Sequence, residues 1–311
     1  VSYEIKRKFT RATDFKAGQY IKSNWKTTAG TSRYPETIEF RFRSPHSVGT
    51  SGSMAILQKG SEWGISLQDN GSTDNYGHLK FTISGSKGTQ YITSSLLPFY
   101  NDEMWSVMLT RKAGANRTDG ASLGGRLPSD TTKSQSVYEL TTKQYDATRN
   151  TILFEDSQSL TSHTASAVAD PNNVSGSQLN AAFTSSGFVF LGGSGSRFGT
   201  QFSGSLMEYR LWSEPLSASV FDNHVRTPKA YNGNSYSSSY DNLFVRYELN
   251  DNKNLQTFPT LSNVAHIQTY ETGSIGASIN GFTGNFSRTL VDKEQLKVPN
   301  VGPNRRNATK I

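Results

Sequence analysis

The fold is decided by the stretch Phe190-Leu191-Gly192-Gly193, followed after a short gap by Phe202-Ser203-Gly204-Ser205-Leu206-Met207-Glu208-Tyr209-Arg210-Leu211-Trp212 and then by Pro215-Leu216-Ser217. The paired glycines permit a turn with positive φ after a buried strand. By alternation, the second run is a strand with two faces, which hold Leu206, Glu208, Arg210 and Trp212 on one side and Met207, Tyr209 and Leu211 on the other. Both faces carry apolar residues, so we expect this strand inside a sandwich or beside a covering loop. Ser217 is a suitable N-cap for a short helix that runs to Val225.

Further strands follow on both sides of this stretch. The clearest half-buried one is 37–43, where Ile38, Phe40 and Phe42 face one side and Glu39, Arg41 and Arg43 the other. Similar patterns predict strands at 54–59, 63–68, 79–84, 104–111, 137–142, 151–154 and 242–249. The polar stretches 113–136 and 157–182 predict long loops. We therefore expect an all-β protein, a two-sheet antiparallel jelly-roll sandwich with long loops and extended termini, whose core includes Phe40, Trp105, Leu191 and Trp212.

Composition narrows the class of protein. The 311 residues contain no cysteine, so apolar burial and not disulfides must stabilise the fold. The sequence has no apolar run of about 20 residues and no signal-peptide pattern at Val1, so we expect no membrane insertion. The formal net charge of +7 is concentrated near the N-terminus. This charge fits a solvated strand face or an acidic protein neighbour, and without a nucleic-acid-binding motif we do not expect nucleic acid as a partner.

The order of these elements resembles a known superfamily. The segments that carry the resemblance are 37–42, 56–60, 63–67, 104–110 and the fold-deciding stretch itself. They resemble laminin-G-like or pentraxin-like modules of the concanavalin-A-like lectin/glucanase superfamily. The resemblance implies N-terminal strands or an arm at 1–34, a jelly-roll domain at 35–250 with insertions near 113–136 and 157–182, and a C-terminal extension at 251–311. Such modules with long tails and no cysteine also look similar to structural proteins of tailed bacteriophages.

Catalytic chemistry finds little support in the sequence. Retaining glucanases need two carboxylates about 5 Å apart, but Glu155 and Asp156 are adjacent and point to opposite faces of a strand. Glu139 and Glu208 each stand alone on their strands. No nucleophile elbow is present, and no two of the five histidines have metal-ligand spacing. We therefore assign no catalytic, cofactor-binding or metal-binding residue and expect a protein that is not an enzyme.

Three loops have more than one interpretation. The loop 193–199 resembles a phosphate-binding loop in composition only, and its spacing favours a β-hairpin loop. The oxygen-rich loop 69–75 could bind Ca²⁺ or be a plain hairpin turn. The segment 230–241 carries Tyr231, Tyr236 and Tyr240, which could form a carbohydrate platform, contact a protein or pack back on the core.

The sequence favours a non-enzymatic virion structural protein, a capsid, neck, tail or fibre component that contacts other virion subunits or itself as a homo-oligomer. The alternative is a carbohydrate-binding adhesion or host-recognition module, extracellular or at a cell surface, with a surface glycan as ligand. The third interpretation is a polysaccharide-active enzyme. The fold alone does not distinguish these three functions, because the same sandwich can host each of them. We expect residues 1–26 and 299–311 to be ordered by neighbouring subunits, although 1–26 could also form an edge strand of the same sandwich.

Overall fold

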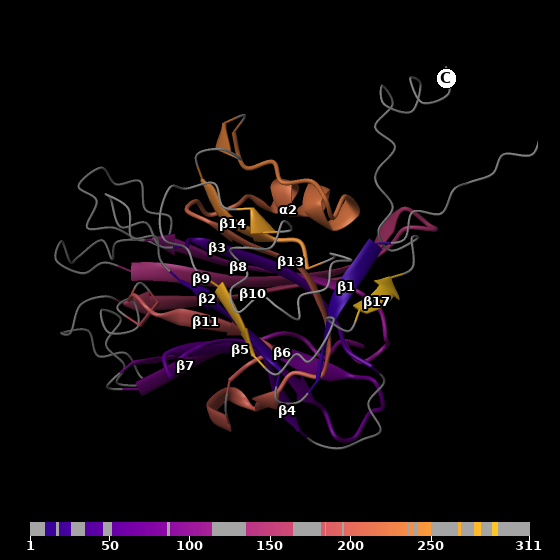
Figure 1. The fold of residues 1–311 in the computed structure, drawn as a ribbon, viewed down its shortest axis with the longest axis horizontal. Helices are drawn as coiled ribbons and strands as arrows, with labels where there is room; N and C mark the ends of the chain where they lie inside the picture. Colours follow the sequence, from indigo (N-terminus) through magenta and orange to yellow (C-terminus); the bar gives the residue numbers. More distant parts are fainter. Residues whose placement is uncertain are drawn as a thin grey trace, which may run out of the picture.

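Alternating apolar residues build two sheets that pack face to face. The computed structural model describes residues 10–16, 19–25, 35–45, 52–85, 88–113, 135–163, 182–183, 185–194, 196–235, 237–238, 242–249, 267–268, 277–280 and 288–291. Within these residues, sheet A has nine strands and sheet B has eight. Figure 1 shows the two sheets as stacked layers, with helix α2 (Ala218–Arg226) on the outer side of sheet A. The predicted two-sheet antiparallel sandwich is confirmed.

Sheet A contains the fold-deciding strand at its centre. Its main path runs β10 (Thr151–His163), β9 (Gln135–Asp146), β8 (Trp105–Ala113), β3 (Thr37–Arg43), β13 (Gly204–Trp212), β1 (Thr10–Phe15) and β17 (Arg288–Val291). Two further strands extend this sheet beside β13, β14 (Leu243–Tyr247) and β15 (Ile267–Gln268). All of these pairings are antiparallel.

Sheet B provides the opposite layer. Its main path runs β16 (Ala277–Asn280), β2 (Tyr20–Asn24), β11 (Phe188–Leu191), β4 (Ser53–Lys59), β5 (Trp63–Asp69), β6 (Gly77–Gly85) and β7 (Gly88–Thr93). The short strand β12 (Thr200–Gln201) pairs with β4 in parallel, just after the 3₁₀ helix η1 (Ser196–Phe198). The polar sequence of β7 gave no strand signal, and β7 was absent from the predicted strands.

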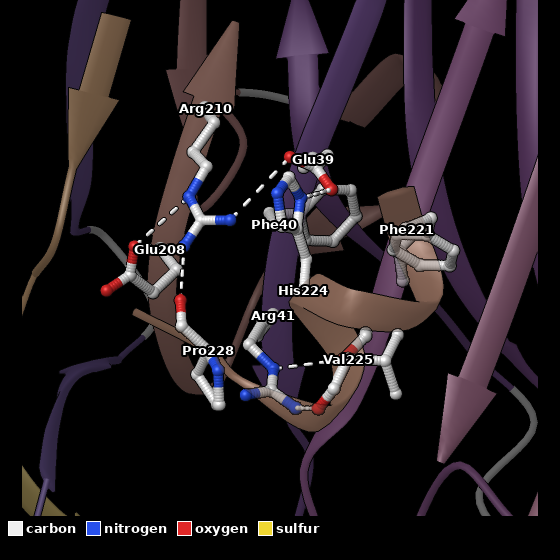
Figure 2. A pocket seen from close by; sticks show the side chains of 11 residues that line it. Glu39, Phe40, Arg41, Glu208, Arg210, Phe221, His224, Val225 and Pro228 are labelled. Atoms are coloured by element: carbon white, nitrogen blue, oxygen red, sulfur yellow. Dashed lines mark hydrogen bonds and ion pairs between the residues drawn. The ribbon is translucent and has the colours of Figure 1, made fainter. Parts of the chain in front are cut away.

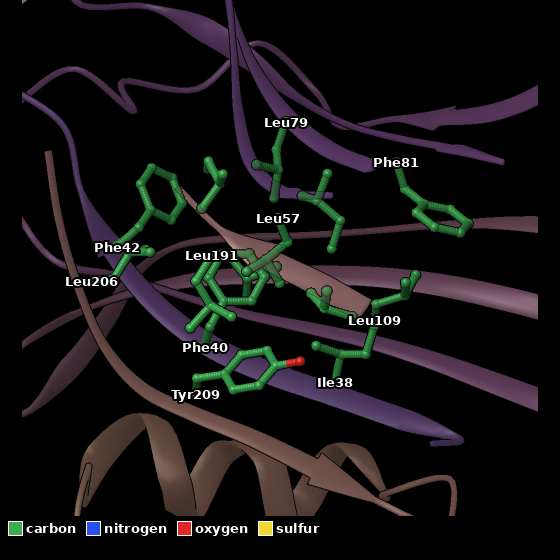
Figure 3. Packing of buried hydrophobic residues seen from close by; sticks show 14 of the residues in the cluster. Ile38, Phe40, Phe42, Leu57, Leu79, Phe81, Leu109, Leu191, Leu206 and Tyr209 are labelled. Atoms are coloured by element: carbon green, nitrogen blue, oxygen red, sulfur yellow. The ribbon is translucent and has the colours of Figure 1, made fainter. Parts of the chain in front are cut away.

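The core lies between the sheets. Figure 3 shows side chains of both layers meeting there, among them Phe40 and Leu109 from sheet A and Leu57 and Leu191 from sheet B. The predicted burial of Phe40, Trp105 and Leu191 is confirmed. Trp212 is also fully buried, but it packs in a second cluster beneath α2 and not between the sheets.

The outer face of β3 differs from the prediction. Alternation placed Glu39 and Arg41 on a solvent-facing side, yet they are only 3% and 5% exposed. Helix α2 covers them and supplies His224 and the carbonyl of Val225 as hydrogen-bond partners. The helix begins at the predicted N-cap, because the hydroxyl of Ser217 accepts from the amide of Val220. The prediction of a half-buried strand was therefore wrong, since the covering helix comes from a distant segment.

A β-bulge changes which residues of β13 face the core. Glu208 has φ of 52°, and the register with β3 shifts between Met207 and Arg210. Leu206 and Tyr209 both lie in the core between the sheets, so one extra residue reverses the alternation. Grouping Leu206 on one face with Glu208, Arg210 and Trp212 was therefore wrong.

Strands β9 and β10 form a longer hairpin than predicted. Residues 157–163, expected in a loop, belong to β10 and pair with 135–141 of β9. The polar residues fit because β10 is an edge strand, with alternate side chains exposed. Asp156 accepts hydrogen bonds from the amide and hydroxyl of Ser95, the second residue after β7. The remainder of the predicted loops, 114–134 and 164–181, lies outside the described residues.

The N-terminal strands belong to the chain's own sandwich. Strand β1 pairs with β13 and β17, and β2 pairs with β11 and β16. Phe15, Ile21 and Trp25 are buried in the core, which explains why these strands need no neighbouring subunit. The expectation that 1–26 is ordered by neighbours is therefore wrong for 10–15 and 20–25. Residues 299–311 lie outside the described residues.

Nothing in the described part of the chain forms a helix with the length and apolar character needed to cross a bilayer.

Candidate functional site

A charged cluster fills a small hollow between sheet A and α2. Figure 2 shows Glu39, Arg210 and His224 directed toward one another. The cavity between the lining residues measures about 10 Å³, which is close to the space of one water molecule. This hollow therefore cannot hold a sugar ring or a cofactor.

The carboxylate of Glu39 is fully engaged in this cluster. One oxygen lies 2.8 Å from Nδ1 of His224, and the other accepts from Nε1 of Trp212 at 2.8 Å and lies 3.7 Å from Nη1 of Arg210. The ring of His224 stacks on Trp212. Burial alone would raise the pKa of Glu39, but His224, Arg210 and Trp212 outweigh burial and lower it. Glu39 is consequently held as a carboxylate and is not suited to donate a proton as a general acid.

Glu208 holds the second half of the cluster together. It accepts hydrogen bonds from Arg210 at 2.8 Å and from Arg246 at 3.0 Å. Arg210 also donates to the carbonyl of Pro228, which fixes the chain that follows α2. Burial and the neighbouring Arg210 lower the pKa of Arg41 to about 10. Glu39 and Glu208 thus converge on Arg210 as buried ion pairs, and the cluster fastens α2 to sheet A.

A larger groove lies on the outer face of sheet B. It has a volume of about 360 Å³, within the range of small-molecule sites. Strands β4 to β7 form its floor, and η1 with the following residue forms one wall. The residues that line it are Ser53, Ser66, Gln68, Lys80, Thr82, Ser84, Thr89, Arg197, Phe198 and Gly199.

Strand alternation explains the polar floor. Ile65 and Leu67 point into the core, so Ser66 and Gln68 of β5 point outward. The same alternation applies to β6, whose outward residues Lys80, Thr82 and Ser84 each follow a core residue, Leu79, Phe81 or Ile83. Ser66 and Ser84 are almost fully covered, at 3% and 8% exposed. The open part of the floor is formed by the amide of Gln68, the ammonium of Lys80 and the hydroxyl of Thr82.

The wall depends on close packing of η1 against the floor. A Cβ atom on Gly64 would lie 2.6 Å from Cγ of Phe198, so only glycine lets this ring sit on β5. The hydroxyl of Ser53 donates to the carbonyl of Phe198 at 3.0 Å, and Arg197 donates to Ser84 Oγ at 2.8 Å. Residues 196–199 thus turn back over sheet B. The prediction of a hairpin loop at 193–199 was wrong, because β11 and β12 each pair with β4 and not with each other.

Tyr91 stands beside the groove on the edge strand β7. It lies opposite Thr82 in the register of β6 and β7, so both side chains share the outer face. Tyr91 is 59% exposed, and the ammonium of Lys80 lies 4.3 Å from the centroid of its ring. Sequence reasoning missed Tyr91 because β7 itself was not predicted.

The residues singled out from the sequence lie elsewhere. Tyr231 is 38% exposed and lies beside Arg246 of β14, while Tyr236 and Tyr240 are outside the described residues. In the loop 69–75, Asp69 accepts from the amide of Gly71 and Asn75 has φ of 66°, as in a hairpin turn. No group of three or more His, Cys, Asp or Glu side chains in the described ranges is arranged to hold a metal ion.

The sequence matches no protein-family model and no curated protein. Solved structures resemble it only distantly. A putative carbohydrate binding protein from Bacteroides ovatus ATCC 8483 is 16% identical with a TM-score of 0.43, over 92% of this chain and 61% of that chain. Tailspike protein 2 from Escherichia coli O157:H7 bacteriophage CAB120 is 13% identical with a TM-score of 0.34, over 62% and 22%.

The enzymatically active domain of Bacteriophage CBA120 tailspike protein 2 is 12% identical with a TM-score of 0.34, over 70% of this chain and 30% of that chain. The chain spans less than two thirds of each of these three structures. The similarity concerns the two-sheet sandwich and names no superfamily, so the lectin/glucanase resemblance stays a prediction from the sequence.

Proposed function

We propose that this chain is a non-enzymatic carbohydrate-binding module whose ligand lies in the groove of sheet B. The observation that carries the proposal is the groove itself, a hollow of about 360 Å³ with a polar floor and an exposed tyrosine beside it. Sugars present hydroxyl groups around the edge of the ring and C–H groups on its faces. A binding site needs groups for both.

The floor supplies the polar half of this recognition. Thr82 carries a hydroxyl that can donate and accept, and Gln68 carries an amide with both functions. The aromatic half comes from Tyr91 and Phe198 at the sides. A ring that is exposed and held on a rigid strand loses little conformational freedom when a sugar stacks on it.

The lining residues also favour binding over catalysis. Among the described residues that line the groove there is no Asp, Glu or His. Glycoside hydrolysis requires a carboxylic acid and a carboxylate across the scissile bond. We therefore expect no release of reducing ends from any polysaccharide that binds. Release that is abolished by changing one Glu or Asp would overturn this part of the proposal.

A glycan array followed by calorimetry tests the binding. Tyr91→Ala should weaken binding about five- to tenfold, because it removes the stacking surface. Tyr76→Ala is the matched control, since Tyr76 is also an exposed tyrosine, at 37%, but lies outside the groove in the turn before β6. Failure to bind any displayed glycan, or equal losses in both variants, would contradict the proposal.

The location of the protein remains a prediction from the sequence, which favours a virion and otherwise a cell surface. A host-recognition module in a virion would combine the predicted structural role with glycan binding. Antibody detection of the chain in purified particles, compared with the unassembled fraction, tests this prediction.

A further inference from the structure

Among the described residues that line it, the groove carries the cations Lys80 and Arg197 and no Asp or Glu. By alternation, the outward residues of β5, β6 and β7 are Gly64, Ser66, Gln68, His78, Lys80, Thr82, Ser84, Thr89, Tyr91 and Thr93. None of them is Asp or Glu. Arg197 on the wall adds a second permanent cation to Lys80. The electrostatic potential in the groove is therefore positive, which favours a ligand with negative charge.

Lys80 differs in its partners from Lys143 and Lys112, two lysines of sheet A that are held by carboxylates. Lys143 pairs with Glu155 at 2.6 Å and Asp222 at 2.5 Å, and Lys112 pairs with Glu139 at 2.9 Å. Lys80 makes no ion pair within the described residues, and its ammonium lies over the ring of Tyr91. It therefore keeps its charge available next to the ring of Tyr91.

Among the described residues, Arg197 likewise has no acidic partner. Within the described residues its guanidinium donates to Ser84 Oγ, and Ser84 in turn lies 2.7 Å from Thr89 Oγ1. A guanidinium has five N–H donors, so this anchor leaves others for a ligand. Its planar fork matches the oxygens of a carboxylate or a sulfate.

We infer that the groove selects anionic glycans, with Lys80 and Arg197 binding a sugar carboxylate or sulfate and Tyr91 stacking on the ring that carries it. This inference rests on the proposed glycan binding and adds the chemical class of the ligand. Attraction between exposed charges weakens with ionic strength, so affinity should fall as salt is raised.

Two matched pairs of probes separate charge from sugar recognition. Tetragalacturonate and its full methyl ester differ only in the carboxylate charge, and dextran sulfate and dextran differ only in sulfate. We expect the acidic member of at least one pair to bind at least about tenfold more tightly at low salt. Lys80→Ala and Arg197→Ala should each lose about tenfold or more for that probe, since each removes hydrogen bonds to a charged group.

Lys22→Ala is the matched control. Lys22 also lies over an aromatic ring, 3.8 Å from the centroid of Phe188, on the same outer face of sheet B. It lies on β2, four strand spacings from β6, or about 19 Å across the sheet. Loss of this charge should leave the affinity within about twofold. Thermal unfolding of each variant verifies that the fold is kept.

The outcomes distinguish the two claims. Equal binding of acidic and neutral probes, with loss in Tyr91→Ala, would overturn the anionic preference and leave glycan binding standing. Tight binding of an acidic probe that Lys22→Ala weakens as much as Lys80→Ala would overturn the groove as the anionic site. Binding of neither member of either pair, with no binding on the glycan array, would overturn both claims.

Discussion

Replacing Glu39 by glutamine tests whether the cluster beneath α2 fastens the helix to sheet A. Glu39 is 3% exposed and faces His224, Trp212 and Arg210 at 2.8, 2.8 and 3.7 Å. Glutamine retains the shape and one acceptor oxygen but removes the negative charge. Breaking a buried ion pair from one side costs about 3–5 kcal/mol. The retained acceptor places Glu39→Gln at the lower end, about 3 kcal/mol.

Thermal unfolding followed by circular dichroism measures this loss. At about 2.1 cal/mol/K per residue, 1 kcal/mol corresponds to about 1.5 °C in a chain of 311 residues, so the midpoint should fall by about 4–5 °C. Glu155→Gln is the control, because the side chain of Glu155 is 54% exposed and its partner Lys143 keeps Asp222. That change should cost less than about 1 kcal/mol. Equal midpoints for the two variants would refute the fastening role of Glu39.

Three further predictions concern stability and the groove. Because the pKa of Glu39 is lowered, its contribution to stability is fully present above about pH 4.5 and is lost as pH falls through the lower pKa of the folded state. The free energy of unfolding should therefore fall less steeply between pH 5 and 2 in Glu39→Gln than in the unchanged protein. Parallel curves for the two proteins would contradict this. Trp212→Ala should cost about 3–5 kcal/mol in urea unfolding, because its indole fills the cluster beneath α2; a loss under about 1 kcal/mol would remove this packing role. Gly64→Ala should displace Phe198, because the new Cβ would lie 2.6 Å from its ring. Calorimetry should then detect weaker glycan binding. Unchanged affinity would show that this wall does not contact the ligand.

Much of the sandwich could be predicted because its strands follow simple alternation. The strands around Phe40, Leu67, Phe81 and Leu191 each bury every second residue in the core, which is the pattern that a sequence displays directly. The bulge at Glu208 was not predictable, because a residue with φ of 52° within a strand leaves no mark on composition.

The site was harder to predict than the fold. Alternation correctly gives the outward positions of β5 and β6, yet nothing local indicates that η1 folds back to make a wall over Gly64. Tyr91 lies in the polar run of β7, where Ile92 alone marks the buried face. The composition of the tyrosine-rich segment 230–241 suggested a binding surface. Whether a tyrosine ring is exposed, however, depends on which neighbours cover it in the fold, and composition does not show this.

The placement of β1 bears on how the chain folds during synthesis. Phe15 pairs with Gly204, which follows it by 189 residues, and β17 closes the other side of β1 later still. At roughly 5–20 residues per second, a ribosome needs about 10–40 s to produce the partner of β1. For that interval the apolar side chains of Ala12 and Phe15 have no sheet to join. A nascent chain of this architecture should therefore depend on chaperone protection of its first strands, and its folding should be slow, as is typical of sheets built from distant partners.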